Sequence, residues 1–321
     1  MGTLVTGSKA FVARLWGNDA PLTATAGFML AALAACSVGL LVDARLVLGA
    51  PVWLKPAKFA LSIAVYSLTL AWLFGHLSSF VRTRRIVGRG TALALLLEMV
   101  IIAGQAARGT TSHFNVSSPL DATLFAIMGI AIVAQTVSTV AVAVALFRQS
   151  FEDRALGWSL RLGMLLTIMG AFLGGAMTRP TEAQLRGMQA GQVTVSGAHT
   201  VGAPDGGRGM PVTGFSREHG DLRVPHFVGL HALQALPLLA LGLRRTRFPS
   251  QKRVRLVVAF GTSYGALVGI LLWQALHGRP FLPSDVSDLA ALGAWAAVTG
   301  VLVWRALTAS AASNRRAVAA A

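Results

Sequence analysis

The side chains best suited to chemistry lie close together in residues 220–237, which read GDLRVPHFVGLHALQALP. Two imidazoles and an amide, those of His226, His231 and Gln234, interrupt a run of apolar residues of membrane-spanning length. Polar groups at membrane depth are costly unless they face protein or water. We therefore expect this stretch to form one wall of a buried polar site for a small molecule or an ion.

Two prolines shape the same stretch. Pro225 stands where a helix favours its first residue, because an N–H in the first turn has no intrahelical partner to lose. Pro237 removes one hydrogen bond inside the helix and crowds the carbonyl of Leu233. The sequence therefore predicts a kink beside Gln234.

A single carboxylate, that of Glu98, lies well inside another apolar segment. Gln105 follows about 10 Å further along the same helical face. A carboxylate at this depth should be protonated or paired with a cation. The sequence leaves three candidate partners open, namely Lys58, Arg161 and His76.

One face of the apolar segment 57–79 is polar along most of its length. Lys58, Ser62, Thr69 and His76 fall within about 40° of one another on an ideal helix. This face predicts either a helix packed in the centre of a bundle or one wall of a lined cavity.

Four histidines are candidate ligands for a haem b or a divalent metal: His113, His226, His231 and His277. On an ideal helix, His226 and His231 point about 140° apart, so they cannot both bind one metal without distortion. The chain has neither a Cys-x-x-Cys-His motif nor an HExxH motif. The sequence therefore leaves open whether the chain binds a haem b or a divalent metal.

The composition identifies the elements that must position these groups. Of 321 residues, 54% are hydrophobic and 12% are charged, against roughly 25% charged residues in a soluble protein. Apolar runs of about 20 residues, each long enough to cross the hydrocarbon core, recur along the chain. We expect an all-α integral membrane protein with eight spans, approximately at 21–42, 57–79, 91–108, 121–147, 158–178, 225–243, 256–276 and 288–307.

The basic residues predict the orientation. The formal net charge of +16 suggests nucleic acid, but Lys and Arg fall mainly in alternate short loops, as membrane insertion requires. One side carries 17 of them and the other 10, and Arg161 inside the fifth span completes the total of 28. We therefore expect cytoplasmic termini, the lipid bilayer as a partner, and no nucleic acid.

Local matches predict an internal repeat. Three pairs recur at nearly constant separation: Phe59 and Phe227 (168 positions), Gln105 and Gln274 (169), and Asp121 and Asp288 (167). Two four-helix halves, 1–150 and 151–321, would follow, with the second carrying a long external loop, 179–224. This loop is either a lid or a flexible tether.

The repeat would bring the polar groups to one outward-facing pocket near the seam between the halves. The candidate substrate-binding residues are Lys58, Glu98, Gln105, His226, His231, Gln234, Gln274 and His277. The alternative for His231 is a structural hydrogen bond to a neighbouring span.

Three motifs carry a resemblance: WLKPAKF (53–59), GQAARGTTSHFN (104–115) and GDLRVPHFVGLHALQ (220–234). Together with the long loop they resemble a group of uncharacterised bacterial polytopic membrane proteins with about eight spans. The resemblance covers most of the chain and implies a bacterial inner-membrane setting, without an activity or site residues.

Several function classes remain open. A small-solute or ion transporter accounts best for two halves, an intramembrane carboxylate and a kinked helix. A haem-b-binding redox protein, a metal-dependent membrane hydrolase and an accessory role are the alternatives. Whether the chain is an enzyme, and how it oligomerises, the sequence does not determine.

The topology can be tested with reporter fusions. A reporter placed after Ala312 should be cytoplasmic, and one inserted within 200–210 should be external, because of the asymmetry in basic residues. Alkaline phosphatase and fluorescent-protein activities distinguish the two sides. The same side for both fusions would contradict eight spans.

Overall fold

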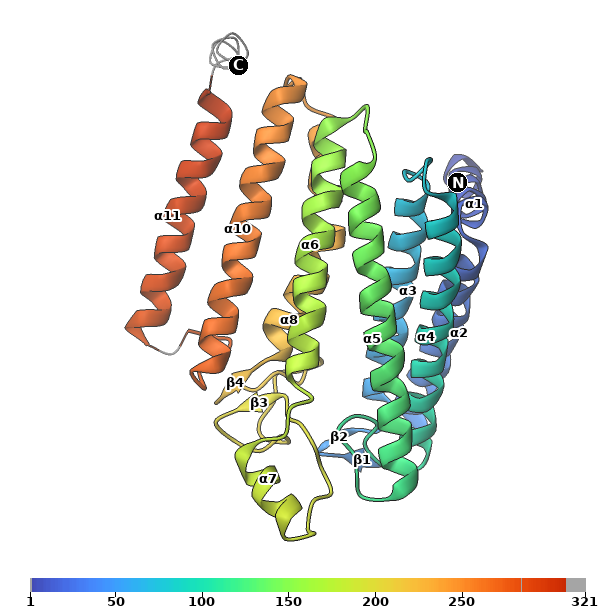
Figure 1. The fold of residues 1–321 in the computed structure, drawn as a ribbon, viewed down its shortest axis with the longest axis vertical. Coiled ribbons are helices and arrows are strands. Elements are labelled where there is room, and N and C mark those ends of the chain that lie inside the picture. The colour runs from blue at the N-terminus through green and yellow to red at the C-terminus, as the bar shows by residue number, and fades with distance from the viewer. Residues whose placement is uncertain (1, 284, 310–321) are drawn as a thin grey trace. The chain divides into compact units, whose positions relative to one another are not determined.

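The computed structural model describes residues 2–283 and 285–309, with side chains from Lys9 onward. Arg315 and Arg316, which were counted above, and the fusion site at Ala312 lie outside the described residues. Long helices dominate the described chain, joined by short loops and two small strand pairs (Figure 1).

The helices are α1 (Gly2–Asn18), α2 (Ala20–Val42), α3 (Leu54–Phe74), α4 (Val81–Ala107), α5 (Pro119–Arg148), α6 (Arg154–Ala176), α7 (Glu182–Gln189), α8 (Arg223–Leu230), α9 (Ala232–Leu243), α10 (Ser250–Leu276) and α11 (Val286–Thr308). The antiparallel strand pairs are β1 (Leu46–Val47) with β2 (Ala50–Pro51), and β3 (Thr200–Val201) with β4 (Gly220–Asp221).

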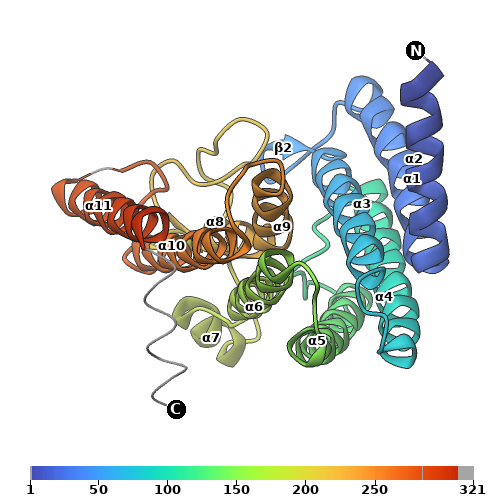
Figure 2. The same ribbon diagram turned by 90° about the horizontal axis from the view of Figure 1, so that it is seen from above.

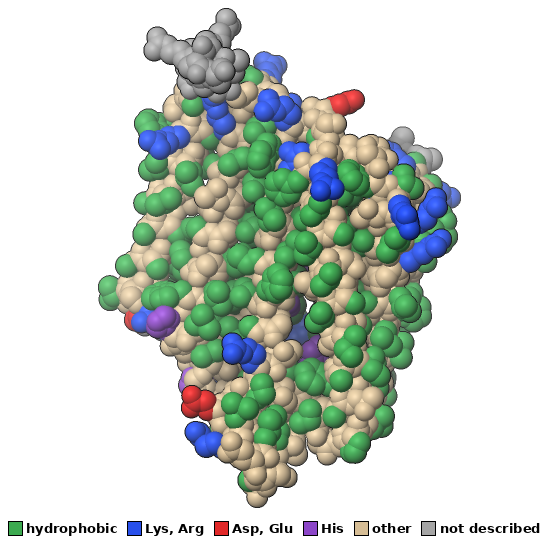
Figure 3. All heavy atoms as spheres, viewed as in Figure 1, with side chains coloured by type: hydrophobic (Ala, Val, Ile, Leu, Met, Phe, Trp, Pro, Cys, Tyr) green, Lys and Arg blue, Asp and Glu red, His purple; other side chains and the backbone are tan. Residues whose placement is uncertain are grey.

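The prediction of an all-α polytopic membrane protein is confirmed. Seven described helices are long and apolar enough to cross a membrane, and the bent pair of α8 and α9 makes an eighth if it is counted as one span. Apolar side chains cover the flanks of the long helices, and Lys and Arg gather toward their ends (Figure 3). Helices suit this setting because they satisfy their backbone hydrogen bonds internally.

Several span boundaries differ from the prediction, among them those of α4 and α3. Helix α4 begins at Val81 rather than near 91, because its first turns are arginine-rich and extend the helix beyond the apolar segment. Helix α3 ends at Phe74, with Gly75 as its C-cap, so His76 lies outside the polar face predicted for this span. On that face, the Thr69 hydroxyl donates to the Val65 carbonyl of its own helix at 2.7 Å.

The contacts divide the chain into two compact units. The first unit contains residues up to 145 together with 176–198 and 204–214. The second unit contains 146–175, 199–203 and the chain from 215 onward. Each unit is described separately below.

In the first unit, α2, α3 and α4 pack around a shared apolar core. Its buried members include Met29 and Cys36 from α2, Ile63 from α3, and Leu95 and Met99 from α4. Helix α1 lies across one end of this bundle rather than along it (Figure 2). Burial of this core fixes the face that each helix turns inward.

The β1–β2 hairpin of the first unit is anchored by its flanking residues. The Trp53 ring packs so closely on α2 that a Cβ at Gly39 would lie 2.7 Å from it. The Trp53 indole N–H donates to the Asp43 carboxylate at 2.8 Å. Hydrogen bonds from the Arg45 guanidinium, together with its positive charge, hold the pKa of Asp43 well below its usual range.

In the second unit, glycines let helices approach closely. A Cβ at Gly170 of α6 would lie 2.6 Å from the Leu230 amide nitrogen, and one at Gly229 would lie 2.8 Å from the Gly170 Cα. Small residues permit such backbone contact between membrane helices. The Tyr264 hydroxyl of α10 adds a hydrogen bond to the Val228 carbonyl at 2.7 Å.

The predicted kink beside Gln234 is wrong, because the chain bends by 40° at His231, between α8 and α9. The Gln234 N–H bonds to the His231 carbonyl at 3.0 Å instead of continuing the helical ladder to Leu230. The Leu230 carbonyl accepts the Thr167 hydroxyl of α6 at 3.2 Å. The Thr167 side chain thus enters the row of backbone hydrogen bonds, and this bends the helix at His231. Pro237 is accommodated inside α9.

The long loop contains regular local structure. Thr181 and Gln184 form a capping box at the start of α7, and the Gln184 side chain also holds both backbone polar groups of Gly197. Further on, β3 pairs with β4. The loop is therefore more than an irregular connection, whereas its role as a lid stays a prediction.

The close approach at Gly170 can be tested by adding one methyl group. Gly170→Ala should destabilise the protein by about 1–3 kcal/mol, because the methyl meets backbone atoms that cannot rotate away. Thermal unfolding in detergent would report a lower midpoint.

Gly269→Ala is the matched control, because a Cβ there meets nothing within 4 Å. The control should leave the midpoint of thermal unfolding unchanged or raise it, because alanine is more stable than glycine in a helix by about 0.5–1 kcal/mol. Equal effects of the two substitutions would contradict the close packing.

Candidate functional site

The carboxylate of Glu98 lies buried on α4, with 6% of the residue exposed. The His113 ring faces it, and the His113 Nε2 lies 3.8 Å from the carboxylate. His113 belongs to the loop after α4, and the next residue, Phe114, has a positive φ of 63°. Phe114 is itself buried and packs edge-on against Phe125 at 5.8 Å, which holds the loop in place.

The three predicted partners make other contacts. The Lys58 ammonium donates to the Thr213 carbonyl at 3.0 Å, and His76 Nδ1 lies 3.1 Å from the Trp72 carbonyl. Arg161 belongs to the second unit, where it donates to the carbonyls of Leu146 and Gln149. The prediction considered residues in or beside the spans, whereas the loop after α4 brings His113 to Glu98.

Aromatic and basic groups surround the pair. The Phe59 ring lies 5.5 Å from the His113 ring, and the Lys55 ammonium lies 5.9 Å from the Phe59 centroid. Lys55 is also close enough to interact electrostatically with Glu98. The Ser112 hydroxyl lies 3.1 Å from His113 Nδ1.

This arrangement is suited to holding and passing a proton. An imidazole titrates near neutral pH, and a carboxylate beside it in an apolar setting exchanges protons with it readily. The low local dielectric strengthens the attraction between the charged forms and makes an unpaired charge costly.

Gln105 is fully engaged in a network at the C-terminal end of α4. Asp121 accepts hydrogen bonds from Gln105 Nε2 at 2.8 Å and from Arg108 Nη1 at 2.7 Å. The Ser118 hydroxyl adds a third at 2.6 Å, and Arg108 also bonds the Gln105 carbonyl oxygen. A ligand at Gln105 would have to compete with this network.

A similar network in the second unit leaves the side-chain amide of Gln274 without a hydrogen bond. Arg279 reaches Asp288 at 3.1 Å and Asp285 at 3.1 Å, and it stacks over Trp273 at 4.9 Å. Gln274 is only 2% exposed, and neither its nitrogen nor its oxygen has a hydrogen-bond partner. A buried polar group left unsatisfied costs about 1–3 kcal/mol, so this amide favours a polar ligand or water.

His226 is held in a defined orientation. Its Nδ1 donates to the Gly170 carbonyl at 2.7 Å, and its ring packs so tightly on α6 that a Cβ at Gly174 would lie 2.6 Å from Cε1. A carbonyl can only accept, so the proton resides on Nδ1 and leaves Nε2 as an acceptor. This is the orientation that metal-binding histidines take.

The remaining predicted histidines are on the surface of the second unit. His231 is exposed at the bend, where its Nδ1 lies 3.4 Å from the Gln234 amide oxygen. His277 Nδ1 bonds the Trp273 carbonyl at 2.8 Å. Within the described part of the chain, no three His, Cys, Asp or Glu side chains are grouped to hold a metal ion.

The structure divides the predicted site residues between the units. Lys58, Glu98, Gln105 and His113 belong to the first unit, and His226, His231, Gln234, Gln274 and His277 belong to the second. A single pocket formed by both sets stays a prediction. Within the first unit, sequence reasoning missed Lys55, which the segment KPAK placed one turn before Lys58 on the same helix.

Comparisons with known proteins add no further assignment. The chain matches no family model, no curated protein and no solved structure. The functional argument therefore depends on the geometry of the chain itself.

The Glu98–His113 pair can be tested with a double-mutant cycle. Glu98→Gln and His113→Gln should each lower the free energy of unfolding, and the double variant should lose less than the sum. We expect a coupling energy of about 0.5–3 kcal/mol, as for residues in direct contact. Reversible unfolding in mixed detergent micelles would measure it.

The control cycle pairs Glu98→Gln with His76→Gln. Because His76 bonds the Trp72 carbonyl instead, these two substitutions should be additive. Strict additivity in both cycles would contradict the pairing.

Proposed function

We propose that this multi-span membrane protein is a transporter of a small solute or an ion. The observation that carries the proposal is the Glu98–His113 pair, a carboxylate buried in a candidate span and faced by an imidazole. Ionisable groups at membrane depth are rare and typically belong to ion pathways or proton relays. Proton-coupled transport is the activity that uses such a pair most directly.

The spacing of the helices is consistent with the predicted internal repeat and supports the same proposal. Helix α10 begins 169 positions after α4, at 250 against 81, and ends 169 positions after it, at 276 against 107. The bent pair of α8 and α9 spans 223–243, which is α3 at 54–74 shifted by the same 169. Parallel repeats of this kind underlie several transporter folds, and the proposed halves remain 1–150 and 151–321.

The polar networks match this shift. Gln105, Arg108 and Asp121 join the end of α4 to the start of α5. In the second unit, Arg279 and Asp288 join the end of α10 to the start of α11 in the same way. The Gln274 amide lacks the hydrogen bonds that Gln105 makes in the first unit, so we assign Gln274 to ligand recognition.

The setting proposed for this transporter is the bacterial inner membrane, with both termini in the cytoplasm. Each unit supports this orientation by itself. In the first, arginines crowd the start of α4, and in the second, Lys252, Arg253 and Arg255 crowd the start of α10. Basic residues at such ends favour the cytoplasmic side.

A haem-b-binding redox protein is the second candidate, and His226 is the observation that favours it. Its Nδ1 is bonded to a backbone carbonyl and its Nε2 is free, as in an axial ligand. A metal-dependent hydrolase and an accessory role have no comparable support in the described residues.

Transport can be tested in proteoliposomes loaded with a pH-sensitive dye. A panel of small organic acids, amines, amino acids and inorganic ions would be added outside, and wild-type protein should move protons with at least one of them. Glu98→Gln should abolish the proton movement, because the amide cannot take up or release a proton.

Glu152→Gln is the control, since Glu152 is exposed and makes the same change in charge. It should transport as wild type does. No flux with any solute, together with a visible spectrum that shifts on reduction, would reject transport and favour haem.

A further inference from the structure

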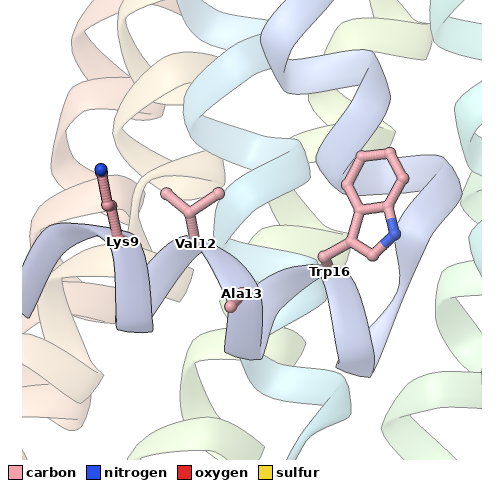
Figure 4. Close-up of a pocket in the computed structure, with 4 residues that line it drawn as sticks. All are labelled: Lys9, Val12, Ala13 and Trp16. Carbon is pink, nitrogen blue, oxygen red and sulfur yellow. The ribbon is translucent and has the colours of Figure 1, made fainter.

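Helix α1 presents a mixed face away from the bundle. Leu15 is 1% exposed and points into the first unit, whereas Val12 and Trp16 are 53% and 54% exposed. Lys9, Val12, Ala13 and Trp16 follow the spacing of one helical face and line a shallow depression of about 540 Å³ (Figure 4). An apolar face with an indole and an ammonium on it suits the boundary between headgroups and acyl chains.

The start of α4 has the same character. Arg82, Arg85 and Arg89 are exposed along one side of its first turns, and with Val81 and Ile86 they line a second depression of about 520 Å³. Ile86 is 61% exposed, so apolar surface again lies beside the cations. The unpaired N–H groups of the first turn add a partial positive charge.

Asp19 brings these two surfaces to the same end of the first unit. It connects α1 to α2 and packs directly against Gly88 of α4, where it interacts electrostatically with Arg84 and Arg89. Asp19 itself is 8% exposed, and its carboxylate caps α2 through the Leu22 N–H. Asp19 is thus turned inward, while the cations face outward.

We call this surface the basic end and define it by its five exposed cations: Lys9, Arg14, Arg82, Arg85 and Arg89. Within the described residues of α1 and of the start of α4, no acidic side chain is exposed among them. Figure 3 shows Lys and Arg side chains gathered over this end of the first unit.

From this geometry we infer that the basic end binds anionic phospholipid headgroups. Charge complementarity selects an anion, and exposed Trp16, Val12 and Ile86 select one with an acyl chain beside it. The basic end also lies at the termini of candidate membrane spans, α2 and α4, where headgroups occur. The inference does not depend on the proposed transport activity.

A soluble anion would leave part of this surface unexplained. A phosphate ion or a nucleic acid backbone would meet the arginines, but neither would cover the apolar side chains between them. An anionic lipid meets both requirements, because arginine binds its phosphate while the apolar residues contact its chain.

The test measures lipid retention by the full-length protein in a neutral detergent. Phosphatidylglycerol or phosphatidylcholine is added, and native mass spectrometry counts the bound lipids. Wild type should retain phosphatidylglycerol in preference to phosphatidylcholine. The triple variant R82Q/R85Q/R89Q should lower the affinity for phosphatidylglycerol by about ten-fold or more and leave phosphatidylcholine unchanged.

The matched control is R186Q/R208Q/R217Q, which removes three exposed arginines from the long loop. It should retain phosphatidylglycerol as wild type does. Equal losses in the two triple variants, or no loss in either, would overturn the inference. The double variant K9Q/R14Q keeps the test decisive if the first variant unfolds, and it should also weaken phosphatidylglycerol binding.

Competition distinguishes the possible anions. Millimolar inorganic phosphate should not displace phosphatidylglycerol, because it lacks the acyl chain. Complete displacement by phosphate, or preferential binding of an oligonucleotide, would show an anion site without lipid specificity and would overturn the assignment.

Discussion

A bilayer offers no water to backbone N–H and C=O groups, so the chain must satisfy nearly all of them within itself. Long helices do this along their length, and the difficult positions are their ends and breaks. Side chains supply the missing partners there. Arg84 donates to the Phe74 carbonyl at the end of α3, and Arg45 donates to the Ala107 carbonyl at the end of α4. At the bend, Thr167 does the same for Leu230.

The same requirement governs the polar side chains. Glu98 is tolerated because the loop after α4 places His113 beside it, and Asp121 is tolerated because four side chains donate hydrogen bonds to it. Gln274 is the exception among the predicted site residues, since its buried amide makes no hydrogen bond. A buried polar group that makes no hydrogen bond in the folded protein gains the most free energy from a polar ligand.

The sequence predicted the spans well and the contacts between them poorly, for one physical reason. Hydrophobicity over about 20 residues is a local property, so the extent of α2 or α11 can be predicted without knowing its neighbours. The partner of Glu98 depends instead on how the loop around His113 folds. The bend at His231 depends on the Thr167 hydroxyl of α6, which is far away in the sequence. The nearby Pro237 had instead suggested a kink beside Gln234.

Helix α1 shows a related limit. Its apolar residues are too sparse to predict a span, and the sequence alone assigned it no structure. What defines it is its placement across the bundle, with Leu15 buried and Trp16 exposed. The proposed repeat has no place for α1, because the shift of 169 relates α3 and α4 to later helices and leaves α1 unmatched. A basic helix outside the proposed repeat, lying across the bundle, is therefore better explained by contact with a membrane surface than by the proposed transport of a solute.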